Sequence, residues 1–424
     1  MSAPALSTPR PLGSATRVQR PKARPRLGII PPDLRIGDGP AAGVMRVART
    51  RGPLSRDVAA KATGLSIATV NRQVSTLLDL GLLRERGDLT PSGAIGRPRV
   101  PFEVNHEPYL TIGIHIGAVV TSIIASDLRG KVLGAVEVPT PQGPSAEALA
   151  TIARSARAFA SRWHRRSPLW AGVALGGRVD AQTGVVDHPR LGWKSARVGA
   201  IVTAGLGLPV SVAAHVEAMA ASELLLTPES EGVAAQGETG LYFYARETAG
   251  IAITIDGRVH TPSSGPGSIA HLPTGSSALC SCGSRGCLEA TISDRAVLAS
   301  AVDAGILTKS TSLPAMSALY KAASSGSAAA HELLVQRAEV LGKTVAMLRD
   351  LFNPDRVILG GQAFTEYPAG IPHVAEAFGR ASSLERKDIR ITGFGNRVQE
   401  YASTVVSLST LFSDPVGAMR RTSL

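Results

Sequence analysis

The chain has 424 residues and a formal charge of +12, from 45 Lys and Arg against 33 Asp and Glu. This length is sufficient for two or three domains. The first residues lack the apolar run of a secretory signal, the longest apolar stretch (110–128) is broken by polar residues, and there are three cysteines. These features argue against a disulfide framework and against a membrane span, and we expect a cytoplasmic protein without a membrane partner.

The positive charge is concentrated at the N-terminal end of the chain. Residues 1–105 hold 17 Lys and Arg and 7 Asp and Glu, a net charge of +10. This distribution is typical of a module that binds a polyanion and is joined to a near-neutral body. Residues 1–40 are basic and rich in proline, and we expect a disordered tail there.

Residues 41–105 have the pattern of a winged helix-turn-helix. After a first stretch of helical periodicity, Ser55 and Ser66 stand where each would cap a helix, and Gly64 stands where the first of these helices would end. That helix would carry Val58, Ala59 and Ala62 inward. A strand, a run of turn residues and a second strand follow, as a wing requires.

The helix after Ser66 predicts a face that contacts DNA. Its apolar residues fall at helical spacing on one side, while polar residues of the kinds that bond base edges and phosphates project elsewhere. We predict contacts to double-stranded operator DNA from Ser66, Thr69, Asn71, Arg72 and Gln73. Arg97, flanked by glycine and proline, would reach a minor groove from the wing. The alternative is a three-helix module that binds protein instead of DNA.

The remaining residues, 106–424, predict a large α/β body. Apolar runs at its start are separated by turn residues, and residues 127–131 make the clearest hairpin. Further strand-like segments each end in glycine or lead into a helix, which is the alternation of an α/β protein.

From about Val44 to its end, the chain resembles the ROK family of repressors and sugar kinases. The resemblance rests on the order of several motifs: the winged helix, IGIHIGA, GGRVDAQTGVV with LGW, a cysteine segment after a histidine, and NPDRVILGG. It implies a body of two lobes of the actin and hexokinase (ribonuclease H-like) type, with sugar and ATP in the cleft between them. Family members with a winged helix are transcription factors, and this chain looks like one of them. We expect a homodimer or higher homo-oligomer, because helix-turn-helix proteins read paired half-sites.

Positions that carry kinase chemistry in the family are altered here. Family kinases have Asp-x-Gly-Gly-Thr at the first strand turn, where the Asp acts with the magnesium phosphate, and this chain has His115 in place of that Asp. The kinase motif Glu-Asn-Asp, whose Asp is the general base, corresponds to Ala213, Ala214 and His215. We therefore predict a transcriptional regulator without kinase activity. The alternative is an ATP-dependent sugar kinase with an appended DNA-binding domain, in which His215 would be the base.

The sugar-binding positions implied by the resemblance are also altered. Where the family has Gly-Glu-Ile-Gly-His, this chain has Ser268 in place of the Glu, while Glu289 remains. The expected effector pocket contains His215, Ser268 and Glu289. Fewer paired acceptors disfavour a usual sugar effector. Two hypotheses stay open: the pocket binds a different metabolite, or the body serves mainly for dimerisation. For His215, a pocket or core histidine is a better explanation than a catalytic base.

The three cysteines follow a histidine in the order His-x8-Cys-x-Cys-x4-Cys. These residues are His271, Cys280, Cys282 and Cys287. Zinc takes such a set tetrahedrally, and the resemblance matches all four positions, so we predict a structural zinc site. A disulfide between Cys280 and Cys282 is disfavoured, because residues two apart on an extended chain lie nearly 7 Å apart at Cα. The rival hypothesis is a redox switch.

Overall fold

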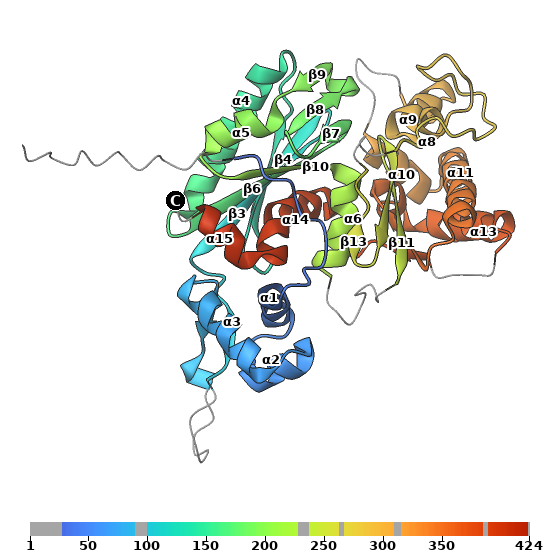
Figure 1. Cartoon of the computed structure of the whole chain (residues 1–424). Helices are drawn as coiled ribbons and strands as arrows, with labels where there is room; N and C mark the ends of the chain where they lie inside the picture. The colour runs from blue at the N-terminus through green and yellow to red at the C-terminus, as the bar shows by residue number, and fades with distance from the viewer. Residues whose placement is uncertain are drawn as a thin grey trace, which may run out of the picture.

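The computed structural model describes residues 28–89, 100–227, 237–262, 267–308, 315–384 and 389–422. A small helical module lies below a body of two lobes, each built on a five-stranded sheet (Figure 1). This arrangement confirms the predicted fold class, an α/β body preceded by a helix-turn-helix. Arg97 and residues 1–27 of the predicted tail lie outside the described residues. Within the described ranges, no helix is long and apolar enough to cross a membrane.

The helical module has three helices and a short antiparallel pair of strands. They are α1 (Pro40–Arg51), α2 (Arg56–Thr63), α3 (Ile67–Asp79), β1 (Leu83–Glu85) and β2 (Phe102–Val104). Gly64 ends α2 with a φ of 69°, which glycine adopts without steric cost. The Ser66 hydroxyl accepts a hydrogen bond from the Thr69 backbone N–H and caps α3. Ser55 precedes α2, but its side chain makes no capping bond.

One predicted core residue of this module lies outside its core. Val58 is 44% exposed, whereas Ala59 next to it is fully buried. The reason is that α2 has only eight residues and buries a single one of them against its neighbours. The helical spacing therefore predicted the helix correctly. It predicted only part of the buried face, since Ala59 is buried and Val58 is not.

The sheet of the first lobe has the strand order β10-β6-β3-β4-β5. Its strands are β3 (Tyr109–Ile116), β4 (Val120–Ser126), β5 (Val132–Pro139), β6 (Ser167–Leu175) and β10 (Val210–Ala214). The strands β3, β4 and β5 are antiparallel neighbours, while β6 and β10 run parallel to β3. The backbone N–H of Asp127 donates to the carbonyl of Lys131, which confirms the predicted hairpin.

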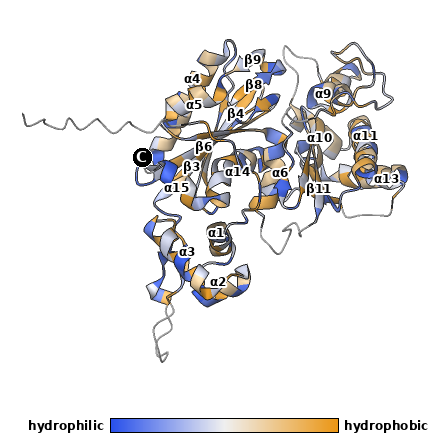
Figure 2. Ribbon diagram, in the orientation of Figure 1, coloured by the Kyte–Doolittle hydropathy of each residue, from blue (hydrophilic) through white to orange (hydrophobic). Residues whose placement is uncertain are grey.

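Helices cover both faces of this sheet, whose strands are largely hydrophobic (Figure 2). On one face lie α4 (Ser145–Ala160) and α5 (Val198–Leu206), and on the other lies α14 (Val398–Ser413). Gly113 and Gly172 allow α14 to lie directly on the strands. A Cβ added at Gly172 would be 2.2 Å from the Ser407 backbone nitrogen, and one at Gly113 would be 2.7 Å from the Ser403 hydroxyl.

The sheet of the second lobe has the order β13-β12-β11-β14-β15. Its strands are β11 (Thr239–Ala245), β12 (Ala249–Ile255), β13 (Arg258–Val259), β14 (Arg356–Gly360) and β15 (Ile389–Ile391). The helices of this lobe are α8 (Leu288–Ile292), α9 (Asp294–Asp303), α10 (Met316–Ser324), α11 (Ala328–Phe352), α12 (Gln362–Thr365) and α13 (Ile371–Ala381). Helix α6 (His215–Leu225) lies between the lobes, where it contacts strands of both sheets and α14. The C-terminal helix α15 (Pro415–Thr422) packs against α14 and α1.

Residues 28–39 differ from the disordered tail that was expected through residue 40. Ile29 pairs with Val210 of β10, and Arg35 pairs with Arg258 of β13. Leu34 is 4% exposed and belongs to the core. The segment GIIPPDLRI, which begins at residue 28, forms these pairs. It was included in the predicted tail because the residues before it are rich in proline and arginine.

A buried carboxylate fixes the wing to the first lobe. Glu103 of β2 is 3% exposed and accepts hydrogen bonds from Arg84 at 2.8 Å, Arg86 at 3.0 Å and Arg129 at 3.1 Å. Burial by itself would raise the pKa of Glu103, but the bonds from Arg84 and Arg86 outweigh it and hold the pKa below its usual value. Arg129 lies in the turn between β4 and β5, so this cluster joins the module to the body.

Candidate functional site

Helix α3 presents the residues that were predicted to contact DNA. Ser66, Asn71 and Arg72 are exposed, and Thr69 and Gln73 are half-buried. On the opposite side of α3, Val70, Val74 and Leu77 are completely buried. This division follows the helical period, because apolar residues three or four apart share one face.

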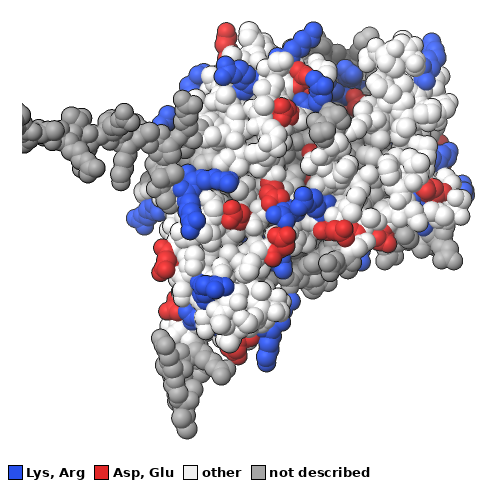
Figure 3. All heavy atoms as spheres, viewed as in Figure 1, with Lys and Arg blue, Asp and Glu red and all other residues white. Residues whose placement is uncertain are grey.

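The charges around α3 suit contact with a polyanion. Among the described residues, Arg72 has no ion-pair partner, so its guanidinium is available to a ligand. In Figure 3, Lys and Arg side chains project from the helical module beside a few acidic ones. Arg84 and Arg86 are held by Glu103, so much of the positive charge counted in the sequence of the wing is already neutralised.

A second candidate site is the cleft between the lobes, which has a volume of about 1190 Å³. His215, Ser268 and Glu289 all line it, so the structure brings the three predicted pocket residues together. They come from different parts of the chain: His215 begins α6, Ser268 precedes the metal-ligand segment, and Glu289 lies in α8.

Two stacked imidazoles lie at the cleft: His215 lines it, and His115 of β3 is buried beside His215. The rings of His115 and His215 are 5.8 Å apart between centroids with an interplanar angle of 9°, and His215 also contacts Tyr244 at 5.5 Å. Burial lowers the pKa of His115 to about 3 and that of His215 to about 4. Both are therefore neutral at pH 7. Among the described groups, Nε2 of His115 is a buried nitrogen without a hydrogen-bond partner.

His188 is a cleft residue that sequence reasoning missed. It ends β8 (Val185–His188) in the small sheet formed with β7 (Arg178–Asp180) and β9 (Trp193–Ala196). Its Nδ1 accepts a hydrogen bond from the Leu191 N–H at 3.3 Å, so a neutral His188 carries its proton on Nε2 and can donate there. Burial lowers the pKa of His188, which favours that neutral form. Its position in the sequence between two motif segments, GVV and LGW, could have identified His188 as a cleft residue.

Arg190 was also missed, and it bridges the two lobes across the cleft. Its guanidinium donates to the Glu247 carboxylate at 3.0 Å, to the Glu247 backbone carbonyl at 2.9 Å, and to the Glu289 carboxylate. Arg190 belongs to the first lobe, whereas Glu247 and Glu289 belong to the second. Glu289, one of the three predicted pocket residues, is therefore already paired within the protein.

The predicted metal ligands converge at the edge of the cleft. The ligand atoms of His271, Cys280, Cys282 and Cys287 all lie within 4.8 Å of one another. Nδ1 of His271 is 3.6 Å from Sγ of Cys280, and the Sγ atoms of Cys282 and Cys287 are also 3.6 Å apart. Three thiolates and one imidazole fit a tetrahedral metal ion with no open position. Cys287 directly precedes α8, so the group would hold the helix that carries Glu289.

Helix α6 also carries a buried carboxyl group that sequence reasoning did not single out. Glu217 is 8% exposed, and burial raises its pKa to about 7. The two histidines are therefore uncharged at neutral pH, whereas the Glu217 carboxyl changes from neutral to ionised as pH rises through about 7.

Comparisons with known proteins agree with this geometry. The sequence model of the ROK family matches residues 111–378. The chain is 55% identical over 400 residues to "Transcriptional regulator Rv0485" of Mycobacterium tuberculosis, covering 93% of this chain and 90% of that one. A crystal structure of a ROK family transcriptional regulator, a homologue of the Escherichia coli Mlc protein, matches with a TM-score of 0.74 at 21% identity over 91% of this chain and 98% of that one. A ROK family glucokinase from Streptomyces griseus, in complex with glucose and AMPPNP, matches with a TM-score of 0.61 at 23% identity over 70% of this chain and 99% of that one.

Glu217 makes the stability of the protein dependent on pH. Its pKa is about 7 in the folded chain and near its ordinary value of 4.5 when unfolded, so its burial costs nothing at low pH and destabilises the fold as pH rises. We expect Glu217→Gln to raise the free energy of unfolding by up to about 3 kcal/mol at pH 8 and by less than about 1 kcal/mol at pH 5. Urea unfolding at both pH values measures the difference, with Glu147→Gln on the exposed surface of α4 as the control. An equal effect at both pH values would contradict the assignment.

Proposed function

The chain belongs to the ROK family, and we propose that it regulates transcription by placing α3 in the major groove of operator DNA. The observation that carries this proposal is the winged helix-turn-helix, whose α3 buries one face and presents exposed polar and basic residues on the other. A relative with 55% identity across 93% of the chain is named a transcriptional regulator. Thr69, Asn71, Arg72 and Gln73 would contact bases, Ser66 would contact the backbone near the helix start, and Arg97 would contact the minor groove.

The cleft in this proposal is a regulatory pocket without kinase activity. Phosphotransfer needs a carboxylate with the magnesium phosphate and a base for the sugar hydroxyl at the same time. His115 and His215 occupy the corresponding positions as neutral imidazoles. Arg190 pairs with Glu289, the remaining carboxylate of the sugar site. A metabolite that binds here would use neutral donors and acceptors from His188, His215 and Ser268.

The metal site in this proposal is structural zinc. Thiolate and imidazole ligands suit zinc, and four protein ligands leave no position for a reactive water. The ion would fix the segment from His271 to Cys287 and thereby the position of α8 and Glu289 beside the cleft. Dimerisation would give two copies of α3 related by two-fold symmetry, as paired half-sites require.

The direct test of the proposed function is binding to DNA from upstream of the protein's own gene. We expect the purified protein to retard such a fragment and Arg72→Ala to weaken binding by about 5- to 150-fold, which corresponds to the loss of a base contact worth about 1–3 kcal/mol. Arg154→Ala, on the exposed surface of α4, is the matched control. A protein that retards no such fragment but consumes ATP with a panel of hexoses would show that the kinase alternative is correct.

The zinc proposal is tested by metal analysis of protein purified under reducing conditions. We expect one zinc ion per chain and a substoichiometric amount in Cys282→Ser, because that variant removes one of four ligands. Ser281→Ala, at the neighbouring exposed position, should keep its zinc. Absence of zinc from the unmodified protein would favour the redox hypothesis for these cysteines.

A further inference from the structure

Residues 28–39 form a strap that connects the two lobes to the DNA-binding module. The Ile30 N–H donates to the Val210 carbonyl of β10 at 2.9 Å, so the strap pairs with the edge of the first sheet. Further along, the Ile36 N–H donates to the Gly257 carbonyl at 2.8 Å, and the Val259 N–H donates to the Leu34 carbonyl at 2.9 Å. Val259 belongs to β13, the edge of the second sheet. The strap then continues directly into α1 at Pro40.

Side chains fix the strap at both lobes. Ile29 packs against Gly199, where an added Cβ would be 2.9 Å from Cγ1 of Ile29. The Ser211 hydroxyl donates to the Ile30 carbonyl at 2.7 Å. Leu34 is 4% exposed in the hydrophobic cluster that also contains residues of the module and of α6. The strap is therefore held by the core and by backbone hydrogen bonds at each lobe.

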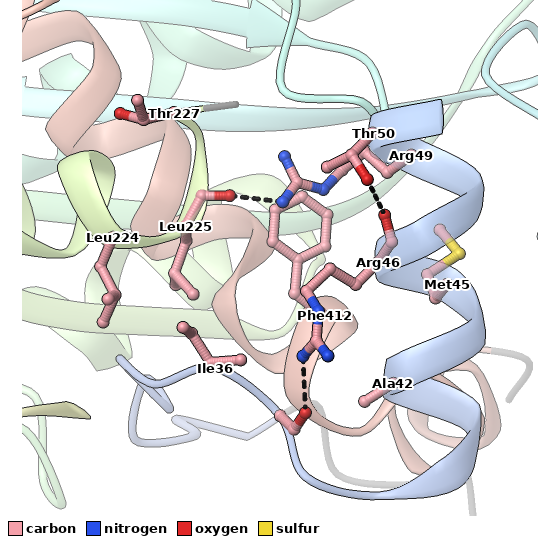
Figure 4. Close-up of a pocket in the computed structure, with 11 residues that line it drawn as sticks. Ile36, Ala42, Met45, Arg46, Arg49, Thr50, Leu224, Leu225, Thr227 and Phe412 are labelled. Atoms are coloured by element: carbon pink, nitrogen blue, oxygen red, sulfur yellow. Dashed lines mark hydrogen bonds between the residues drawn. The ribbon is translucent and has the colours of Figure 1, made fainter. Parts of the chain in front are cut away.

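Two arginines of α1 bind backbone carbonyls at the junction between the module and the body (Figure 4). Arg46 donates to the Gly37 carbonyl of the strap at 3.1 Å. Arg49 donates to the Leu225 carbonyl at the end of α6 at 2.5 Å, and its guanidinium lies 4.7 Å from the centroid of the Phe412 ring of α14. Figure 4 shows both hydrogen bonds on the side of α1 that faces the body. Helix α1 is thus attached to the strap and to α6.

Helix α6 connects this junction to the cleft. It has 11 residues, a length of about 16 Å, with His215 in the cleft at one end and Leu225 beside α1 at the other. It packs on strands of both sheets, so a change in the angle between the lobes changes its contacts. The same change would alter the distance between the two sheet edges to which the strap is hydrogen-bonded.

We infer that the strap, Arg46 and Arg49 form a coupling junction that transmits the angle between the lobes to α1 and hence to α3. The angle is set at the cleft by Arg190, which pairs with Glu247 and Glu289 of the opposite lobe. A change in that contact moves the sheet edges, and the strap cannot keep its hydrogen bonds to both edges unless its C-terminal end and α1 move too. The consequence for DNA rests on the proposed function, whereas the movement of α1 does not.

The test is a double-mutant cycle read by hydrogen exchange of the α1 backbone in the full chain without DNA. One change is Arg190→Met, which breaks the contact between the lobes, and the other is Arg46→Met with Arg49→Met, which breaks the junction. In the chain with an intact junction, we expect Arg190→Met to change the hydrogen-exchange rate of the α1 backbone by about fivefold or more. This factor is the lower end of the usual coupling between two sites. In the chain that carries Arg46→Met and Arg49→Met, the change in exchange rate caused by Arg190→Met should be less than about twofold. Equal changes in both backgrounds, or no change in either, would overturn the inference.

A control and a second variant make the outcome specific. Arg420→Met removes an exposed arginine from the neighbouring helix α15 and should leave the effect of Arg190→Met intact. Gly37→Ala disturbs the strap without removing either arginine, because its Cβ would be 2.8 Å from the Cα of Ser413 and 2.7 Å from the Cβ of Ala42. It should also reduce the coupling, and it carries the test if the double arginine variant does not fold. Coupling without DNA retardation would contradict the proposed function alone.

Discussion

Helix α6 is buried between the two sheets, and this packing determines both the cleft and the position of the helix-turn-helix module. Small side chains such as Ala218, Ala220 and Ala221 are almost fully buried and let the helix approach strands of both lobes. Its first residue, His215, reaches the cleft, and the carbonyl of Leu225 at its other end binds Arg49 of α1. The hydrophobic cluster around α6 continues without interruption into the module. The fold therefore places the cleft and helix α1 of the helical module at opposite ends of one element.

The chemistry of the cleft depends on two buried neutral histidines and on an ion pair between the lobes. The imidazoles of His115 and His215 are stacked, and burial keeps them uncharged at pH 7. Glu289 pairs with Arg190 of the opposite lobe. Arg190 also pairs with Glu247, so it joins the two lobes at the cleft. The architecture that serves catalysis in family kinases can here serve as a two-lobed sensor.

Features set by local sequence could be predicted, whereas features set by contacts between distant segments could not. Ser66 and Gly64 fixed the helix boundaries because capping and left-handed backbone are local effects. The cysteine segment predicted a cluster with His271 because the ligands lie close in the chain. The strap was not predicted because its partner strands, β10 and β13, are far from it in the sequence: Ile29 pairs with Val210 and Arg35 with Arg258. Arg190 escaped for the same reason, since its role depends on the opposite lobe. The assignment of Val58 was wrong because spacing does not determine how much of a short helix is covered.

The central proposal is that α3 binds a specific DNA sequence and that the protein regulates transcription in this way. Genome-wide mapping of bound DNA in cells, with the unmodified protein and with Arg72→Ala at equal abundance, tests it most directly. The account predicts discrete sites that share an inverted repeat, with half-sites about one helical turn or a multiple of it apart, and their loss or weakening in the variant. Absence of enriched sites, or the same sites at the same strength in the variant, would contradict it.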